Sequence, residues 1–392
     1  MTEIDSTAKP TTSFSIDPNG VVARVFLAFL TTAGIFYINI MPALVSGLKE
    51  GLGFTNQQAG FVSSANLYGA AFGALLAVFV IKHIRWKPWC YLLLVSIFVL
   101  DGLCILIDSA SLMIAVRGFH GLVGGLLVGI GFGVMSRTEQ ADKSFGYLLF
   151  VQWGLGGLGL MVLPGLVPEY GTSALFIALL IFTGVTMAMM PFLPDYPLPK
   201  NKSEKTNDAS IPWLTLGLTI AAIFLFQGAN MGLFAYIIGM AKNEGLSIEF
   251  ISPALAMASW IALIGAFAVI VIGTKYGRLL PLIVGIVVTG LCSWALHFSE
   301  VATIYLVANV IIGITWAFVL PYMFGICSEL DKRGQLAALG GFASKMGLAS
   351  GPMVAALLLG EDNYTLIINV AVVGLLMCVA LVALPARTLD VA

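Results

Sequence analysis

The feature that most constrains the fold is a series of long apolar segments that recurs along almost the whole chain. A helix needs about 20 consecutive, mostly apolar residues to cross a bilayer, and the sequence holds twelve segments of this kind. Because a backbone in lipid must satisfy its own hydrogen bonds, they predict twelve transmembrane helices and an all-α membrane protein. Their limits are residues 23–46, 57–81, 88–107, 110–135, 144–168, 172–193, 212–240, 250–273, 279–298, 301–326, 335–359 and 364–385.

The composition supports a membrane protein and excludes several other classes. Only 10% of the 392 residues are charged, whereas a typical soluble domain has about 25%. The net charge of -1 offers no basic patch for nucleic acid. The five cysteines form no CxxC pair, and the phosphate-loop, HExxH and GxSxG patterns do not occur. We therefore expect no enzyme activity, no metal, no cofactor and no nucleic-acid partner.

The positive charges predict the orientation in the membrane. If the N-terminus lies inside the cell, 15 of the 19 lysines and arginines fall on the cytoplasmic side. Lys49 and Lys242 fall on the outer side, and Arg117 and Lys345 lie within helices. Membrane proteins keep an excess of Lys and Arg in their cytoplasmic loops. Both termini are therefore expected in the cytoplasm, in a multi-pass protein of the cell inner membrane.

One polar segment divides the chain. The stretch "PDYPLPKNKSEKTNDASIP", residues 194–212, contains prolines and charges of both signs and is typical of a flexible linker. It separates two sets of six apolar segments. The expected order is a cytoplasmic tail, a six-helix half, a cytoplasmic linker, a second six-helix half and a short cytoplasmic tail. The limits of these parts are 1–20, 21–193, 194–211, 212–386 and 387–392.

The two halves repeat each other. When the chain is overlaid on itself at an offset of about 192 to 194 residues, charged and small residues match in order along the whole half. Two parallel six-helix repeats are typical of transporters whose halves are related by an axis along the membrane normal, and such halves can rock about a central site. Matching residues include Glu50 with Glu244, Lys82 with Lys275, Arg85 with Arg278, and Gly121 with Gly313.

The six-plus-six repeat, the linker and two short patterns give the chain a resemblance to the major facilitator superfamily. "GTKYGR", 273–278, is similar to the family's loop signature between helices 8 and 9, with Thr274 where the family has an acid. "VIKHIRWKP", 80–88, is the matching first-half loop, and "RGFHGLVGG", 117–125, resembles the family's fourth-helix pattern. The resemblance implies a twelve-helix secondary transporter that works by alternating access. It also implies a cytoplasmic conformational latch formed by Lys82, Arg85, Lys275, Gly277 and Arg278.

Three formal charges and one histidine lie well inside the predicted spans, and intramembrane charges mark functional sites by default. Asp101 and Arg117 each lie about 10 Å from the outer ends of neighbouring antiparallel helices, so they are matched in depth. They form either a structural pair or a proton-sensitive switch. His120 follows Arg117 by three residues, on the same helix face. It is either a proton carrier or a hydrogen-bonded packing residue.

Lys345 lies about 15 Å into its helix, at the bilayer midplane, with no acid within a turn of it. In the repeat its counterpart is Gln152, and the counterpart of Arg117 is Asn309. The family resemblance implies that helices 4, 5, 10 and 11 surround a central cavity. We therefore expect a split anion site, with Arg117 from one half and Lys345 from the other. The alternatives for Lys345 are an ion pair with a distant acid or a snorkelling side chain.

Polar and aromatic residues on other helices complete the predicted site. Softer candidates are Asn39, Gln227, Trp153 and Trp260, and any single aromatic residue here can equally be a packing residue. The predicted substrate-binding set is Arg117, Lys345, His120, Gln152, Tyr37, Asn230, Asn309 and Trp316, with Asp101 and His120 for proton coupling.

These observations favour a monomeric secondary transporter that takes up a small organic anion, of carboxylate or sulfonate type, together with protons. Its partners would be the substrate, protons and the lipid bilayer. The alternative is a proton-driven exporter of amphipathic drugs or metabolites, in which the aromatic residues dominate and the charges are structural. The family's glycine–proline antiporter signature is not met in the fifth segment, "VQWGLGGLGLMVLPG", which disfavours drug/proton antiport.

Overall fold

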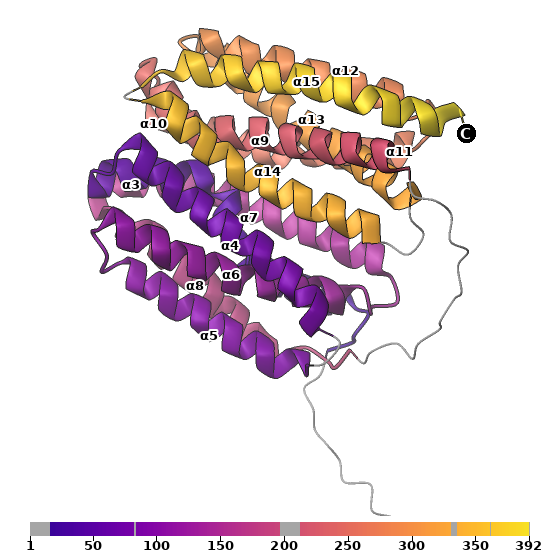
Figure 1. Cartoon of the computed structure of the whole chain (residues 1–392). Coiled ribbons are helices and arrows are strands. Elements are labelled where there is room, and N and C mark those ends of the chain that lie inside the picture. Colours follow the sequence, from indigo (N-terminus) through magenta and orange to yellow (C-terminus); the bar gives the residue numbers. More distant parts are fainter. Residues whose placement is uncertain (1–15, 82–83, 197–211, 331–334, 361, 392) are drawn as a thin grey trace, which may run out of the picture.

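The computed structural model describes residues 16–81, 84–196, 212–330, 335–360 and 362–391, which form helices and the turns that join them (Figure 1). The first half holds α1 (Val21–Ala33), α2 (Phe36–Asn39), α3 (Met41–Leu52), α4 (Asn56–Val80), α5 (Trp86–Cys104), α6 (Ala110–Met135), α7 (Ala141–Tyr170), α8 (Ser173–Met189) and the short η1 (Met190–Phe192). The second half holds α9 (Trp213–Asn243), α10 (Ile248–Ile261), α11 (Leu263–Ile272), α12 (Leu279–Ala295), η2 (Leu296–Phe298), α13 (Ala302–Leu330), α14 (Gln335–Leu359) and α15 (Tyr364–Val391).

The described helices match the predicted spans to within a few residues at most ends. Within the described parts of the chain, eleven helical segments are long and apolar enough to cross a membrane, and Val21–Ala33 is apolar but shorter. The helix α15 ends at Val391 and so includes residues 387–391, which were expected to belong to a short tail. Most of the predicted linker, 194–211, lies outside the described residues.

The first predicted span, 23–46, is divided into α1, α2 and α3 rather than forming one helix. The backbone leaves regular helical geometry at Ile35 (φ −133°, ψ 5°) and at Ile40 (φ −110°, ψ 17°). Gly34 lies so close to α6 that a Cβ there would overlap the carbonyl oxygen of Gly124. Pro42 lies in the first turn of α3, where its missing N–H is not needed. The apolar pattern alone did not predict this break.

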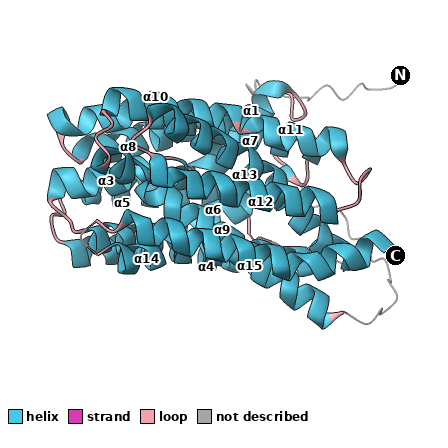
Figure 2. Ribbon diagram, turned by 90° about the horizontal axis from the view of Figure 1, so that it is seen from above, coloured by secondary structure: helices cyan, strands magenta, loops and turns pink. Residues whose placement is uncertain are grey.

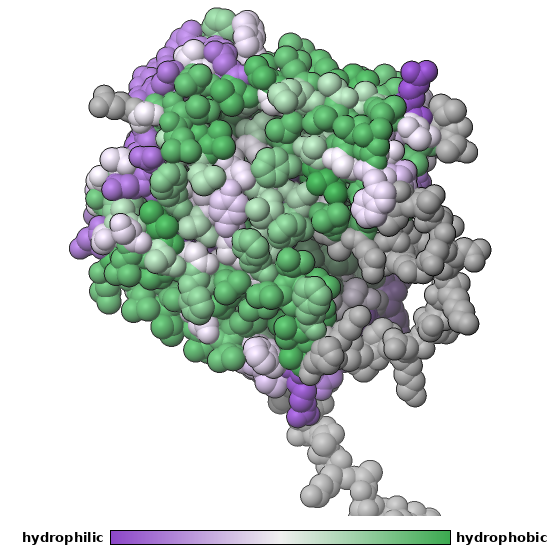
Figure 3. Space-filling model, in the orientation of Figure 1, coloured by the Kyte–Doolittle hydropathy of each residue, from purple (hydrophilic) through white to green (hydrophobic). Residues whose placement is uncertain are grey.

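Apolar side chains cover the outside of the bundle. Figure 2 shows the helices running alongside one another, and Figure 3 shows a broad hydrophobic face with hydrophilic residues gathered toward its edges. Ile270 and Leu106 are 80% and 79% exposed. In a bilayer, lipid chains surround such side chains, and the backbone polar groups are satisfied within the helices.

Glycines let α4 and α6 approach each other backbone to backbone. A Cβ at Gly69 or Gly73 would overlap backbone atoms of α6, and a Cβ at Gly121 or Gly125 would overlap backbone atoms of α4. Small residues of this kind form the close helix contacts of membrane proteins, where lipid tails are as apolar as the side chains. This seam fixes the position of α6, which carries Arg117.

The two halves meet along α4 and α14, α7 and α10, and α3 and α9. At the end where α3 stops, Lys242 Nζ lies 2.7 Å from Glu50 Oε1, and Lys49 Nζ lies 3.8 Å from Asp362 Oδ1. Nearby, the Tyr236 hydroxyl donates to the Asn56 carbonyl oxygen at 2.7 Å. These contacts hold the halves together at that end of the bundle, which is the outer end in the orientation predicted from the positive charges.

Candidate functional site

A cavity of about 430 Å³ lies between the two halves. The first half lines it with Ile35, Ile38 and Asn39 around α2 and with residues of α7, and the second half contributes α9, α10, α11, α13 and α14. This volume lies within the range of about 300–1,000 Å³ that is typical of small-molecule pockets. Most of the lining side chains are apolar, and Lys345 is the charged one among the described residues that line it.

The structure brings five of the predicted substrate-binding residues to this cavity, namely Lys345, Gln152, Asn230, Asn309 and Trp316. Of the softer candidates, Asn39, Gln227 and Trp153 line it as well. Sequence reasoning missed Ser259, Phe234 and Phe324, because nothing in an apolar pattern distinguishes the face that turns toward a cavity from the face that packs.

Three asparagines of the cavity use their amide nitrogens within the protein. Asn230 Nδ2 donates to the Phe226 carbonyl oxygen at 2.8 Å, and Asn309 Nδ2 donates to the Tyr305 carbonyl oxygen at 2.8 Å. Asn39 Nδ2 donates to the carbonyl oxygen of Gln152 at 2.9 Å. These bonds fix the amide orientations, because only the nitrogen can donate. Asn230 Oδ1 is buried and has no hydrogen-bond partner among the described residues.

A chain of side-chain hydrogen bonds joins three second-half helices beside Lys345. Trp316 Nε1 on α13 donates to Gln227 Oε1 on α9 at 2.6 Å. Gln227 Nε2 then donates to Ser344 Oγ on α14 at 2.6 Å. The Phe234 ring meets Trp316 edge-on, with an angle of 84° and 6.1 Å between the ring centroids. The Trp316 indole is therefore held in one orientation, and Lys345 follows directly after the last residue of this chain.

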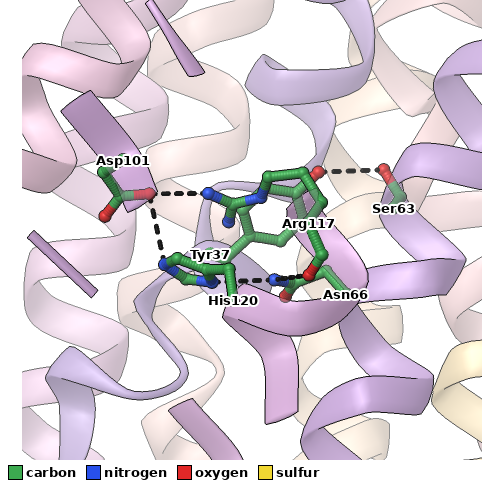
Figure 4. A network of polar contacts seen from close by, with 6 residues as sticks. All are labelled: Tyr37, Ser63, Asn66, Asp101, Arg117 and His120. Carbon is green, nitrogen blue, oxygen red and sulfur yellow. Dashed lines mark hydrogen bonds and ion pairs between the residues drawn. The ribbon is translucent and has the colours of Figure 1, made fainter. Parts of the chain in front are cut away.

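A second group of polar residues lies buried within the first half (Figure 4). Arg117 Nη1 donates to Asp101 Oδ1 at 2.6 Å, and the His120 Nε2 atom lies 3.2 Å from the same oxygen. Arg117 is 0% exposed and Asp101 is 1% exposed. The Arg117 guanidinium also lies over the Tyr37 ring, 4.2 Å from its centroid. We call the group of Tyr37, Ser63, Asn66, Asp101, Arg117 and His120 the buried ion cluster.

Asn66 determines how His120 is oriented within the cluster. Its Nδ2 donates to the Arg117 carbonyl oxygen at 3.1 Å and lies 2.9 Å from His120 Nδ1. A neutral His120 must therefore accept at Nδ1 and carry its proton on Nε2, the atom that faces Asp101. The Tyr37 hydroxyl and the Ser63 hydroxyl are 3.4 Å apart and close the other side of the cluster.

The split-site hypothesis placed Arg117 and Lys345 around one cavity, and the structure separates them. Arg117, His120 and Tyr37 do not line the cavity that Lys345 lines. The physical reason is that Arg117 has an acid at matching depth on α5, so its charge is paired within the first half. Tyr37 turns toward Arg117, whereas its neighbours Ile38 and Asn39 turn toward the cavity. The short α2 therefore lies between the cluster and the cavity.

The described residues of the predicted cytoplasmic latch lie at the opposite end of the bundle from the Glu50–Lys242 pair. Arg278 Nη2 lies 2.5 Å from Glu329 Oε1. The Asp390 carboxylate of α15 accepts the backbone N–H groups of Arg278, at 2.7 and 2.9 Å, and of Leu279, at 2.9 Å. Gly277 adopts φ +69° beside this carboxylate, a conformation that favours glycine.

The helix α15 thus supplies a carboxylate to a loop that has Thr274 where the family signature has an acid. Lys275 lies exposed in the same loop, and Arg85 lies exposed just before α5. Lys82 lies outside the described residues.

Comparison with known proteins gives a family and a fold. The family model described as Major Facilitator Superfamily matches residues 25–356. The structure of the nucleoside transporter NupG superposes with a TM-score of 0.73 at 14% identity, covering 92% of this chain and 98% of that one. The structure of the human organic anion transporter MFSD10 (TETRAN) superposes with a TM-score of 0.65 at 14% identity, with the same coverage. No curated protein sequence matches the chain.

Proposed function

The chain belongs to the major facilitator superfamily, and we propose that it is a proton-coupled symporter that takes up a small organic anion by alternating access. Membership makes it a multi-pass membrane transporter and not an enzyme. The substrate class, the coupling ion and the direction are our proposal. At 14% identity, the similarity to the solved structures shows only the fold. The proposal therefore rests on this chain's own residues.

The observation that carries the proposal is Lys345, a cation in a cavity between the two halves without an acid among the described residues that line it. A charge that faces a mostly apolar cavity is poorly solvated, and without a partner this is unfavourable. Desolvation therefore favours a bound anion, which restores neutrality and gains charge-assisted hydrogen bonds from the ammonium group. An anion bound here contacts a helix of the second half while facing α7 and α2 of the first, so binding is coupled to the relative position of the halves.

The contacts between the halves support an inward-facing arrangement. The pairs Glu50–Lys242 and Lys49–Asp362 join the halves at one end. The cavity lining reaches Leu149 and Phe324, toward the opposite ends of α7 and α13. We place twelve spans in the inner membrane with both termini in the cytoplasm. In this orientation, the end at which the ion pairs join the halves faces the outside. Alternating access then requires these outer contacts to separate when the site opens outward, and a single copy of the chain suffices for this.

The buried ion cluster is our proposed proton site. Asp101 faces Arg117 and His120 on α6, and Cys104 lies one turn further along α5. A proton on Asp101 would remove the counter-charge of Arg117, whose guanidinium lies on the Tyr37 ring. Because α2 also carries Asn39 into the cavity, a shift of Tyr37 would be transmitted to the substrate site. Proton and substrate would thus bind at separate places linked by one short helix.

A thermal-shift panel tests the anion site. The purified protein is heated with acetate, succinate, benzoate, benzamide and tetraphenylphosphonium, and the Lys345→Gln variant is compared with the unaltered protein. We expect at least one anion to raise the unfolding temperature, benzamide not to do so, and the effect to be lost in Lys345→Gln. Stabilisation by the cation alone would contradict the proposal and favour the exporter of amphipathic compounds, for which the apolar lining of the cavity is the supporting observation.

Proteoliposomes test the coupling. Benzenesulfonate stays ionised at any working pH, so it cannot carry a proton through the lipid by itself. Its addition outside vesicles that enclose a pH-sensitive dye should acidify the interior, and Asp101→Asn should abolish this proton entry. Sodium-dependent uptake without acidification would contradict proton coupling and leave the anion site untouched.

A further inference from the structure

The cavity specifies more than a negative charge. We infer that the substrate is a monoanion with a flat, mostly apolar body that also carries an uncharged hydrogen-bond donor, as an aromatic hydroxy acid does. This inference rests on the proposed anion transport and narrows its substrate class. It follows from three properties of the cavity lining: the number of charges, the fixed aromatic wall and the unpaired acceptor oxygen of Asn230.

The number of charges indicates a single anionic group. Lys345 is the charged residue among the described residues that line the cavity. Arg117 cannot serve as a second cation, because it is fully buried against Asp101 within the first half. A second carboxylate on the substrate would therefore be desolvated without a partner, which is strongly unfavourable. Dianions should bind worse than monoanions of the same shape.

The aromatic wall indicates a flat apolar body. Trp316 lines the cavity and is fixed by the hydrogen bond to Gln227 and by the edge-on contact with Phe234. A rigid aromatic side chain gives contact area without losing rotamer freedom on binding. Trp153 and Phe324 line the same cavity. Offset or edge-to-face packing on these rings favours an aromatic substrate over a small hydrophilic acid.

The unpaired oxygen of Asn230 indicates a hydrogen-bond donor on the substrate. The amide nitrogens of Asn230 and Asn309 each donate a hydrogen bond to the carbonyl oxygen four residues earlier in the same helix. Asn230 Oδ1 is left buried at the cavity without a hydrogen-bond partner in the described chain. An unpaired buried acceptor is unfavourable. A substrate hydroxyl or ring N–H would satisfy it, whereas an ammonium group would be repelled by Lys345 in a cavity whose described lining has no acid.

Matched ligands test the inference on the purified protein. Isothermal titration compares 4-hydroxybenzoate with benzoate, which lacks the donor, with 4-hydroxybenzamide, which lacks the charge, and with isophthalate, which adds a second charge. We expect 4-hydroxybenzoate to bind tightest. Loss of the hydroxyl should weaken binding about 5–10-fold, and loss of the charge about 10–100-fold. Isophthalate should bind at least about tenfold more weakly than 4-hydroxybenzoate.

Two variants assign these effects to residues. Asn230→Leu should reduce the affinity for 4-hydroxybenzoate to that for benzoate and leave the affinity for benzoate unchanged. Lys345→Gln should weaken both acids by the same factor. If either variant fails to fold, the ligand series on the unaltered protein still tests the substrate inference. Tighter binding of isophthalate or succinate, or equal binding of benzoate and 4-hydroxybenzoate, would overturn the inference and leave anion transport standing. No binding of any anion would remove the proposed function itself.

Discussion

Each half of the molecule contributes one cation inside the membrane, and the two cations have opposite surroundings. Arg117 is fully buried, 2.6 Å from Asp101 and stacked on Tyr37. Lys345 is partly exposed to the cavity and has no acid among the described residues around it. The first charge has its counter-ion within the protein, and we propose that the second binds a ligand. A buried pair and an unpaired cation need different tests, because we expect the pair to control stability and the unpaired cation to control binding.

The repeat explains why the two were expected together. Asn309 is the repeat counterpart of Arg117, and Gln152 is that of Lys345. Lys345, Gln152 and Asn309 all line the cavity. Of these four residues, Arg117 alone does not line the cavity, because its side chain pairs with Asp101 on α5. A repeat thus predicts where a backbone position lies, whereas the direction of a long side chain depends on the partner it finds.

Removal of the two charges gives the largest expected difference. Arg117→Met leaves Asp101 buried with His120 as its remaining partner, and breaking a buried pair costs about 3–5 kcal/mol. Lys345→Met removes an unpaired charge and should leave stability unchanged or slightly raised. Thermal unfolding of both purified variants, followed by tryptophan fluorescence, compares them directly. If both variants lost a similar amount of stability, Lys345 would have a structural partner.

A double variant separates charge from packing at the same place. Apolar residues can replace a buried ion pair at little cost in stability. Asp101→Leu combined with Arg117→Met should therefore regain most of the stability lost in Arg117→Met alone, while the proposed proton entry stays abolished. If the double variant is as unstable as the single one, the contact of Arg117 with Tyr37, rather than its charge pair, dominates.

The backbone around Arg117 provides the second test of the comparison. A Cβ at Gly121 would overlap the carbonyl of Asn66, the residue that orients His120, whereas a Cβ at Gly118 meets Ala65 only at an ordinary 3.8 Å. Gly121→Ala should destabilise the protein by about 1–3 kcal/mol through overpacking. Gly118→Ala, one turn away on the same helix, is the matched control and should change the unfolding temperature little. Equal effects would mean that α4 can move away from α6 freely.

Much of the fold, and less of the candidate site, follows from the sequence. Apolar length predicts the spans, since hydrophobic thickness fixes how many residues cross. Depth matching predicts that Asp101 and Arg117 can meet, and they do, at 2.6 Å. The break at Ile35 and Ile40 was not predicted, because it depends on Gly34 touching Gly124 on a distant segment. The free oxygen of Asn230 was not predictable either, since its amide nitrogen had several possible acceptors.

The ion pairs at the outer end of the proposed orientation give the smallest expected effect. Lys242 and Glu50 lie 2.7 Å apart across the two halves, with side chains 33% and 35% exposed. Partly exposed pairs contribute about 0.2–1 kcal/mol. Unlike the buried ion cluster, this pair stabilises one arrangement of the halves rather than the fold. Glu50→Gln should therefore leave the unfolding temperature nearly unchanged and shift the balance toward outward opening about 1.4–5-fold.

A cysteine at Ala235 reports this shift, because Ala235 is 1% exposed beside the pair. In a background with Cys292→Ser, which removes the partly exposed native thiol, a membrane-impermeant maleimide added outside should label Ala235→Cys faster when Glu50→Gln is present. Exchange of the two charges, by Glu50→Lys with Lys242→Glu, should restore slow labelling. High salt should speed labelling of the unaltered pair, because it screens exposed charges. If the labelling rate responds to none of these three changes, uncharged contacts such as that of Tyr236 with Asn56 close this end instead.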